Sequence, residues 1–241
     1  AIATAAEFGH LDCLRYALQH QGAWEKIADP EMLYVRAVAK GQMASVKLLQ
    51  RSIHNLTIKG QNKNPAWEYH LPNIAAEHGQ LECLQYLHKS GSDISKSIIF
   101  AGRSSHVSCL QYLHKLGNEL ETTVCIEAAK HGSLACLEYF YLNGGVWHYF
   151  ACHAAALNGH SECLRYLLEQ GCPLTGPSTQ YMNYFGVLFE PSELVVEVAR
   201  RQHWECVKYL IVYNYHLTAS LTTSLMCRDQ PELLKLALQH G

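Results

Sequence analysis

The chain has 241 residues, of which 49% are hydrophobic, so it is long enough to bury a continuous core. Its 19 basic and 21 acidic residues are interspersed and give a net charge of −2, which excludes the electrostatic footprint of a protein that binds nucleic acid or an anionic membrane. No run approaches about 18 apolar residues, so the sequence predicts no membrane-spanning helix.

One short pattern recurs eight times along the chain. Its clearest copy spans residues 75–87 and reads AAEHGQLECLQYL. When the cysteine of this copy is taken as the marker, the equivalent residues are Cys13, Ser45, Cys83, Cys109, Cys136, Cys163, Cys206 and Leu233. Four of the seven intervals between markers are 26 or 27 residues, so a unit of about 27 residues with three longer insertions accounts for the chain.

The columns of the pattern predict a helix, a glycine turn and a second helix in each copy. Small residues eight positions before the marker, such as Ala75, predict a first helix that approaches its neighbour closely. Leu84 and Leu87, one and four residues after the marker, belong to the apolar stripe of the second helix. Gly79 between the helices and Gly91 after the second one stand where a left-handed residue ends a helix.

In chain order, the copies predict a single repeat domain over residues 1–241. The eight repeats span about 1–22, 30–53, 67–91, 93–117, 120–145, 147–171, 190–214 and 217–241, with insertions near 54–66 and 172–189. Trp67 and Trp147 precede their first helices in the same register, and together with Trp24 they are expected to pack between repeats. The predicted fold class is an all-α solenoid of eight helix pairs, in which each repeat buries its apolar faces against its neighbours.

This pattern resembles the ankyrin repeat, a two-helix hairpin with a projecting β-turn and a usual length of about 33 residues. The resemblance rests on the Ala-Ala-x-x-Gly-His run, matched at Gly9-His10 and Gly159-His160, and on the Leu-Glu-Cys-Leu run at residues 81–84. About six residues of the β-turn and the Thr-Pro-Leu-His opening of the first helix are missing. The repeat therefore resembles the short variety found in protists, algae and giant viruses.

The ten cysteines raise the question of a disulfide framework, but eight of them occupy two columns of the repeat. Six are markers, and Cys125 and Cys152 share a second column. Neighbouring copies of one column lie about 8–10 Å apart, whereas a disulfide needs its Cα atoms within about 7 Å of each other. We therefore expect buried free thiols, which indicate a reducing intracellular compartment such as the cytoplasm.

The sequence carries no motif for metal binding or catalysis. The two nearest cysteines, Cys163 and Cys172, are nine residues apart, whereas structural zinc sites use pairs separated by two to four residues. The histidines recur by column, which favours roles in bonding neighbouring loops over catalysis, as at His10 and His160. The common nucleophile, phosphate-loop and zinc-protease motifs are absent. We expect no enzyme activity, no metal and no cofactor.

The columns that vary most between repeats lie between the paired alanines and the turn glycine. In the proteins that this chain resembles, they line the concave surface that binds partners, although exposure alone would also explain the variation. The resemblance thus implies a partner-binding surface that consists of Glu7, Phe8, Lys40, Glu77, His78, Arg103, Ser104, Lys130, His131, Leu157, Asn158, Arg200 and Arg201.

The second insertion is the other predicted contact region. It carries Tyr181, Tyr184 and Phe185 among prolines and glycines. So many aromatic side chains must be covered, either by the adjoining repeats or by a partner.

These observations predict a non-catalytic scaffold for protein-protein interaction, whose partner is another protein rather than nucleic acid or a membrane. The alternative is an architectural subunit of a large assembly, which would make its contacts through the insertions rather than through the repeat surface. The identity of the partner and the oligomeric state are left open by the sequence, because the function of a repeat fold depends on surface detail.

Overall fold

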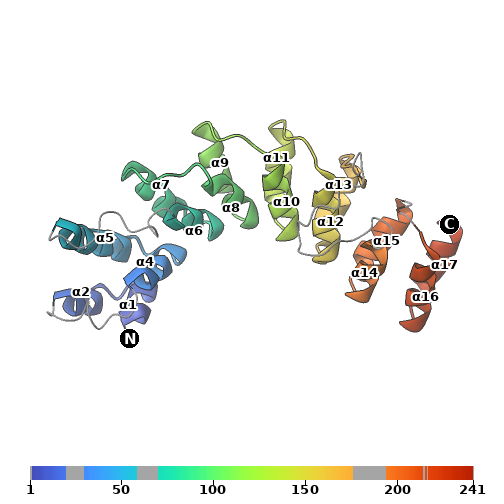
Figure 1. Ribbon diagram of the computed structural model, residues 1–241, viewed down its shortest axis with the longest axis horizontal. Helices are drawn as coiled ribbons and strands as arrows, with labels where there is room; N and C mark the ends of the chain where they lie inside the picture. The colour runs from blue at the N-terminus through green and yellow to red at the C-terminus, as the bar shows by residue number, and fades with distance from the viewer. Residues whose placement is uncertain are drawn as a thin grey trace. The chain divides into compact units, whose positions relative to one another are not determined.

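The computed structural model of the chain describes residues 2–19, 30–58, 70–175, 194–213, 215 and 217–240, with the backbone alone at 30, 31 and 53–58. In this part of the chain there are sixteen helices and no strand, which confirms the prediction of an all-α fold (Figure 1). Trp24, Trp67, Tyr181, Tyr184, Phe185 and most of both predicted insertions lie outside the described residues.

Contacts between the helices divide the chain into two compact units. Unit 1, Ala1–Glu119, contains four consecutive helix pairs. They are α1 (Ile2–Phe8) with α2 (Leu11–Gln19), α4 (Pro30–Ala39) with α5 (Met43–Ile58), α6 (Leu71–Glu77) with α7 (Leu81–Lys89), and α8 (Ser97–Arg103) with α9 (Val107–Lys115).

Unit 2, Leu120–Gly241, also contains four helix pairs. They are α10 (Thr122–Lys130) with α11 (Leu134–Leu142), α12 (Tyr149–Leu157) with α13 (Ser161–Glu169), α14 (Leu194–Arg200) with α15 (Trp204–Val212), and α16 (Ala219–Cys227) with α17 (Pro231–His240). Each pair begins within one of the predicted repeats, but α5 continues to Ile58 and so extends past residue 53 into the predicted first insertion.

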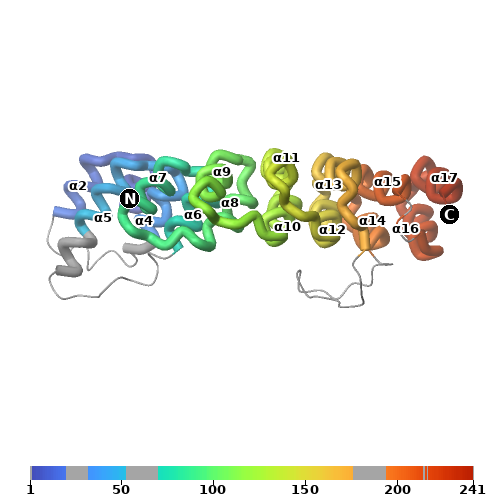
Figure 2. Tube along the Cα trace, turned by 90° about the horizontal axis from the view of Figure 1, so that it is seen from above, coloured from blue at the N-terminus to red at the C-terminus, as the bar shows by residue number. Residues whose placement is uncertain are grey.

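Each unit consists of two layers of helices. In unit 2 the first helices α10, α12, α14 and α16 lie side by side in one layer, and α11, α13, α15 and α17 form the other (Figure 2). The helices of unit 1 pack in the same alternating way. Each repeat therefore buries its apolar faces against the next one, which is the architecture of helical repeat proteins.

The predicted apolar stripe of the second helices is buried. Leu84, Leu110, Leu137 and Leu164 have no exposed surface. Burial of a leucine side chain of this kind stabilises a protein by roughly 1.5–3 kcal/mol. The stripe is weaker in the eighth repeat, where Leu234 is only half-buried.

Left-handed residues end the helices where the sequence predicts them. The turn glycines and the glycines after the second helices have positive φ angles at Gly9, Gly41, Gly79, Gly91, Gly117, Gly132, Gly144, Gly159 and Gly171. In repeats seven and eight, Gln202 and Asp229 adopt the same conformation, with φ of 65° and 53°. The turn therefore keeps its geometry in repeats seven and eight, whereas repeat four, which also lacks the glycine, ends its first helix with Ser104 in an extended conformation.

All ten cysteines are free, and eight of them are buried, as expected for thiols that act as small apolar side chains. Cys13 and Cys227 are the exceptions. The exposure of the marker Cys13 has a structural reason, because markers pack against the preceding repeat: Cys83 Sγ lies 3.3 Å from Met43 Sδ. Among the described residues, no repeat packs against α2 from the side of Cys13, and this thiol is exposed.

Trp147 packs between two repeats, as predicted. Its ring stacks on Tyr141 at a centroid distance of 5.2 Å and lies 5.5 Å from the ring of Phe140, both in repeat five. The edge-to-face contact with Tyr166, at 6.3 Å, connects it to repeat six.

Ser45 occupies the marker position of repeat two, where six of the other seven repeats carry cysteine. It is fully buried, and its hydroxyl group has no hydrogen-bond partner among the described residues. Since an unsatisfied buried hydroxyl costs about 1–3 kcal/mol, we expect Ser45→Ala to raise the free energy of unfolding by about 1 kcal/mol, as measured by urea denaturation. Ser97 is the matched control, because its buried hydroxyl donates to Asn73 Oδ1 at 2.9 Å. Ser97→Ala should lower stability, and equal effects of the two changes would contradict this explanation.

Candidate functional site

The predicted partner-binding residues lie at the C-terminal ends of the first helices of repeats one to seven. We call them the helix-end strip. In unit 1 the strip consists of Glu7, Phe8, Lys40, Glu77, His78, Arg103 and Ser104, and in unit 2 it consists of Lys130, His131, Leu157, Asn158, Arg200 and Arg201. Because the first helices of a unit lie side by side, the strip runs along one edge of the first-helix layer in each unit.

Most of the strip is accessible to a partner. Phe8, Lys40, His78, His131, Asn158, Arg200 and Arg201 are exposed, and Glu7, Glu77, Arg103 and Lys130 are half-exposed. Ser104 and Leu157 are buried, so they present no side chain to a partner. Repeat register places a residue at a helix end but does not show which way its side chain points.

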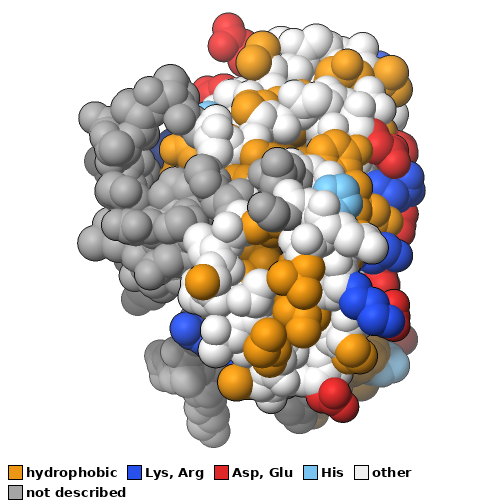
Figure 3. Space-filling model, turned by 90° about the vertical axis from the view of Figure 1, so that its right-hand side faces the viewer, with side chains coloured by type: hydrophobic (Ala, Val, Ile, Leu, Met, Phe, Trp, Pro, Cys, Tyr) orange, Lys and Arg blue, Asp and Glu red, His pale blue; other side chains and the backbone are white. Residues whose placement is uncertain are grey.

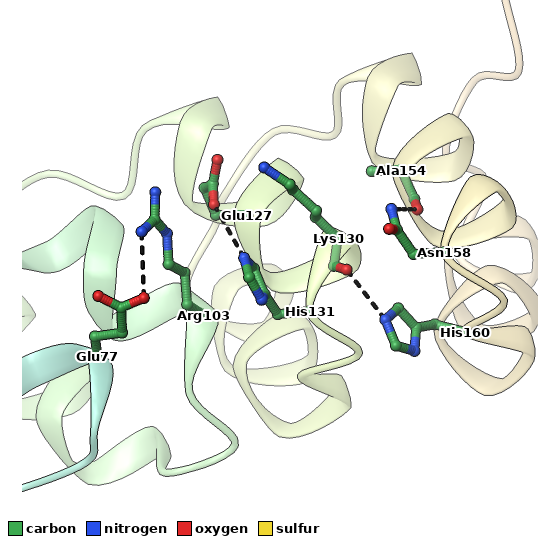
Figure 4. A network of polar contacts seen from close by, with 8 residues as sticks. All are labelled: Glu77, Arg103, Glu127, Lys130, His131, Ala154, Asn158 and His160. Atoms are coloured by element: carbon green, nitrogen blue, oxygen red, sulfur yellow. Dashed lines mark hydrogen bonds and ion pairs between the residues drawn. The ribbon is translucent and has the colours of Figure 1, made fainter. Parts of the chain in front are cut away.

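Ion pairs between neighbouring repeats hold the strip of unit 1. Glu7 of repeat one pairs with two cations of repeat two, Arg36 at 3.2 Å and Lys40 at 3.9 Å. Arg103 of repeat four pairs with Glu77 of repeat three at 3.3 Å (Figure 4). The Arg103 guanidinium also lies over the ring of Phe100, 4.6 Å from its centroid. These contacts restrict the side chains before any partner arrives.

In unit 2, acidic residues lie beneath the exposed cations. Glu127 contacts His131 at 3.6 Å (Figure 4), and Glu197 pairs with Arg200 at 2.8 Å and with Arg201 at 3.0 Å. The side chains of Glu127 and Glu197 are only 6% and 14% exposed. At the end of α14, the charges that face solvent are therefore mainly positive.

A hydrogen bond across the turn connects neighbouring repeats along the strip. His160 Nε2 of repeat six donates to the carbonyl oxygen of Lys130 at 3.0 Å (Figure 4). Arg201 Nη1 of repeat seven donates to the Leu157 carbonyl at 3.0 Å, and in unit 1 Gln80 Nε2 donates to the Ala39 carbonyl at 3.2 Å. The loop-bonding role expected of His160 is confirmed. Arg201 thus has a structural contact besides its exposed guanidinium edge.

The turn glycine makes room for this hydrogen bond. A Cβ atom added to Gly132 would lie 2.6 Å from His160 Nδ1, which is closer than side chains can approach. The φ of 73° at this residue is a second reason for glycine, because the left-handed conformation is strained for other residues.

The sequence predicts only some of the acidic residues that contact basic side chains of the strip. Glu127 and Glu197 stand four residues before His131 and Arg201, a spacing that predicts a helical contact. The pair of Glu7 and Arg36 is 29 residues apart, so it becomes visible only once the repeats are stacked.

Sequence comparison with protein families gives the same repeat. The family model described as "Ankyrin repeats (many copies)" matches residues 74–141, and the model described as "Ankyrin repeat" matches residues 147–176. These matches identify residues 74–141 and 147–176 as ankyrin repeats. Ankyrin repeats are generally modules for protein-protein interaction. The assignment to the short variety of protists, algae and giant viruses stays a prediction.

Solved structures support the ankyrin fold over most of the chain. The chain is similar to the ankyrin repeat domain of human ASB11, with a TM-score of 0.57 and 19% sequence identity over 86% of this chain and 97% of that domain. No curated protein matches the sequence.

The buried thiols of these ankyrin repeats are not poised as nucleophiles. Burial raises the pKa of the Cys83, Cys109 and Cys163 thiols to about 11 and that of Cys206 to about 12. The thiolate is the reactive form, so it is scarce at neutral pH.

One partly buried polar group, around His153, lies inside unit 2. His153 Nε2 donates to the carbonyl oxygen of Leu174 at 3.0 Å, and Tyr215 Oη lies 3.2 Å from the same nitrogen. Burial lowers the pKa of His153 to about 4, so the ring is neutral at pH 7. We interpret this group as structural, because it connects repeat six to Leu174 and to Tyr215, three residues after the end of α15.

Two further findings bear on function. Among the residues that the structure describes, no group of three or more His, Cys, Asp or Glu side chains could hold a metal ion. None of the described helices is both long enough and apolar enough to cross a membrane.

Proposed function

We propose that the chain is a non-catalytic scaffold that binds another protein through the helix-end strip. The observation that supports this proposal most strongly is the combination of exposure and fixed position along the strip. Side chains of different chemistry, such as Phe8, Asn158 and Arg201, are exposed at equivalent positions of different repeats. Backbone hydrogen bonds and ion pairs hold several of them in place, which reduces the entropy lost on binding.

We further propose that the protein works in a reducing intracellular compartment, the cytoplasm. All ten cysteines are free thiols, which agrees with such an environment. The aromatic insertion, with Tyr181, Tyr184 and Phe185, is proposed as a secondary contact region.

A triple substitution within unit 2 tests the strip. Lys130→Ala, Asn158→Ala and Arg200→Ala together should weaken binding of a captured partner at least about tenfold, which corresponds to about 1.4 kcal/mol. Arg103 is left in place, because its removal would also break the pair with Glu77 and the contact with Phe100. Binding is measured by biolayer interferometry on the full chain, and thermal unfolding is recorded for each variant.

The second-helix layer of the same unit supplies a matched control. Lys208→Ala, Asn143→Ala and Arg165→Ala remove the same three residue types from the other layer. Asn143 Nδ2 donates to the Tyr139 carbonyl at 2.7 Å, as Asn158 Nδ2 donates to the Ala154 carbonyl at 2.8 Å. Arg165 and Arg200 both pair with glutamates of their own helices. Partner binding should survive in the control; equal losses in the two triple variants would count against the strip.

A further inference from the structure

We infer that the segment bound along unit 2 is acidic and that Arg200 is the residue that selects it. This inference rests on the proposed function, and it adds the chemistry of the partner. The chain as a whole has a net charge of −2, so a preference for acidic partners does not follow from composition. It follows from the way charges are arranged at the ends of α10 and α14.

First, the basic side chains of these pairs are more exposed than the acidic ones. At the end of α14, the Arg200 and Arg201 side chains are 67% and 42% exposed, whereas the single glutamate that serves both, Glu197, is 14% exposed. At the end of α10, His131 is 40% exposed and its partner Glu127 is 6% exposed. At the end of α14 a partner therefore meets the two arginines first, and the cluster of Arg200, Arg201 and Glu197 has an excess positive charge.

Arg200 and Arg201 have different roles within this cluster. Arg201 spans two repeats, because it pairs with Glu197 and donates to the carbonyl of Leu157 in repeat six. Arg200 pairs with Glu197 of its own helix and is the more exposed of the two. Arg201 accordingly positions the repeats, whereas Arg200 presents its guanidinium to a partner. Guanidinium groups bind carboxylates with two parallel hydrogen bonds, which gives this contact both strength and orientation.

The spacing of the repeats sets the spacing of the acidic residues. Lys130 and His131 end α10, and Arg200 and Arg201 end α14, with α12 packed between the two helices. Two steps between packed helices correspond to about 20 Å. An extended chain advances about 3.3 Å per residue, so the two cationic positions match carboxylates about six residues apart. Asn158 lies between them and offers an uncharged hydrogen-bonding group.

Charged side chains also gather along one edge when the molecule is viewed onto α16 and α17, while hydrophobic and uncharged side chains spread over the face itself (Figure 3). Met226 and Leu238 of these two helices are exposed. This end face therefore differs in chemistry from the helix-end strip.

Synthetic peptides test the inference on the full chain. The first panel consists of fluorescein-labelled peptides in a Gly-Ser background with two Asp-Asp pairs placed two, six or ten residues apart. The second panel has the same lengths with Asn, Leu or Lys in place of Asp. Fluorescence anisotropy should give the tightest binding for the acidic peptide with a spacing of six, and the affinity should fall as salt is raised.

Three single substitutions distinguish a specific contact of Arg200 from a general attraction between positive charges of the protein and the acidic peptide. Arg200→Ala should weaken binding of the acidic peptide at least about fivefold, whereas Lys208→Ala removes one positive charge from the second-helix layer and should change it less than twofold. Lys208 is 53% exposed, so the comparison is between accessible cations. Arg201→Ala should lower the midpoint of thermal unfolding more than Arg200→Ala does. Equal losses of affinity in Arg200→Ala and Lys208→Ala would overturn the inference.

The outcome also separates this inference from the proposed function. In one outcome, peptides of the second panel bind, acidic peptides do not, and the Lys130, Asn158 and Arg200 triple variant abolishes binding. The acidic preference is then wrong, and the strip remains the binding surface. If no peptide of either panel binds in a way that depends on the strip, both proposals fail. Equal competition by a single-stranded oligonucleotide of the same charge would also overturn the assignment to an acidic protein segment.

Discussion

Gly132→Ala is expected to lower the free energy of unfolding by about 3 kcal/mol, and Gly144→Ala by only about 1 kcal/mol. Both glycines belong to repeat five and have positive φ angles, of 73° and 82°, so the backbone strain of an alanine is similar at the two positions. They differ in their surroundings. A Cβ at residue 132 would lie 2.6 Å from His160 Nδ1, whereas one at residue 144 would meet no atom within 4 Å.

The difference between the two variants measures how much the hydrogen bond across the turn contributes to stability. Displacement of His160 breaks its bond to the Lys130 carbonyl and leaves that oxygen without this donor. Urea denaturation gives the two free energies. In a His160→Ala background, where the clash is removed, the cost of Gly132→Ala should fall to that of Gly144→Ala. Equal costs at the two glycines in the unmodified chain would show that the turn residue does not couple neighbouring repeats.

Acidification from pH 7 to pH 4 is expected to remove about 3 kcal/mol of stability through His153 alone. Burial lowers the pKa of His153 to about 4, whereas an unfolded chain has a histidine pKa of about 6.5. Because the unfolded state takes up the proton more readily, the contribution is complete above about pH 6.5 and is lost as the pH falls toward 4. Burial also lowers the pKa of the neighbouring His148, which acts in the same direction.

His153→Asn isolates this effect. The amide of asparagine does not titrate, so the variant should show a flatter dependence of stability on pH between 7 and 4, although its stability at pH 7 is lower. His240→Asn replaces an exposed histidine of the same unit and should keep the steep profile of the unmodified chain. An unchanged slope in His153→Asn would mean that other groups cause the acid sensitivity.

The helix pairs and their turns could be predicted from the sequence because the repeat restricts each column in the same way. Gly79 and Gly159, for example, are left-handed where the pattern requires the end of a helix. The exposure of Cys13 was not predicted, since a marker is buried only when a preceding repeat covers it. The residue types in one column of the repeat do not show whether a preceding repeat packs over that position.

The sequence predicted where the residues of the helix-end strip lie, but not which of their side chains are exposed or what they contact. Leu157 and Ser104 share the register of the exposed residues and are nevertheless buried. Arg201 was predicted to contact a partner, and the structure shows that it also bonds the Leu157 carbonyl of the previous repeat. Such contacts depend on side-chain directions and on residues about one repeat away, which periodicity alone does not specify. The contact roles of the strip and of Tyr181, Tyr184 and Phe185 stay predictions.

The most direct test of the account compares three chains in one affinity measurement with the same captured partner. They are the unmodified chain, the Lys130, Asn158 and Arg200 triple-alanine variant, and a chain that lacks residues 176–189. If the strip is the binding surface, the triple variant loses at least about tenfold in affinity and the deletion stays within about twofold of the unmodified chain. The opposite result, with binding lost in the deletion and kept in the triple variant, would contradict the account and favour an architectural subunit that is held through its insertions.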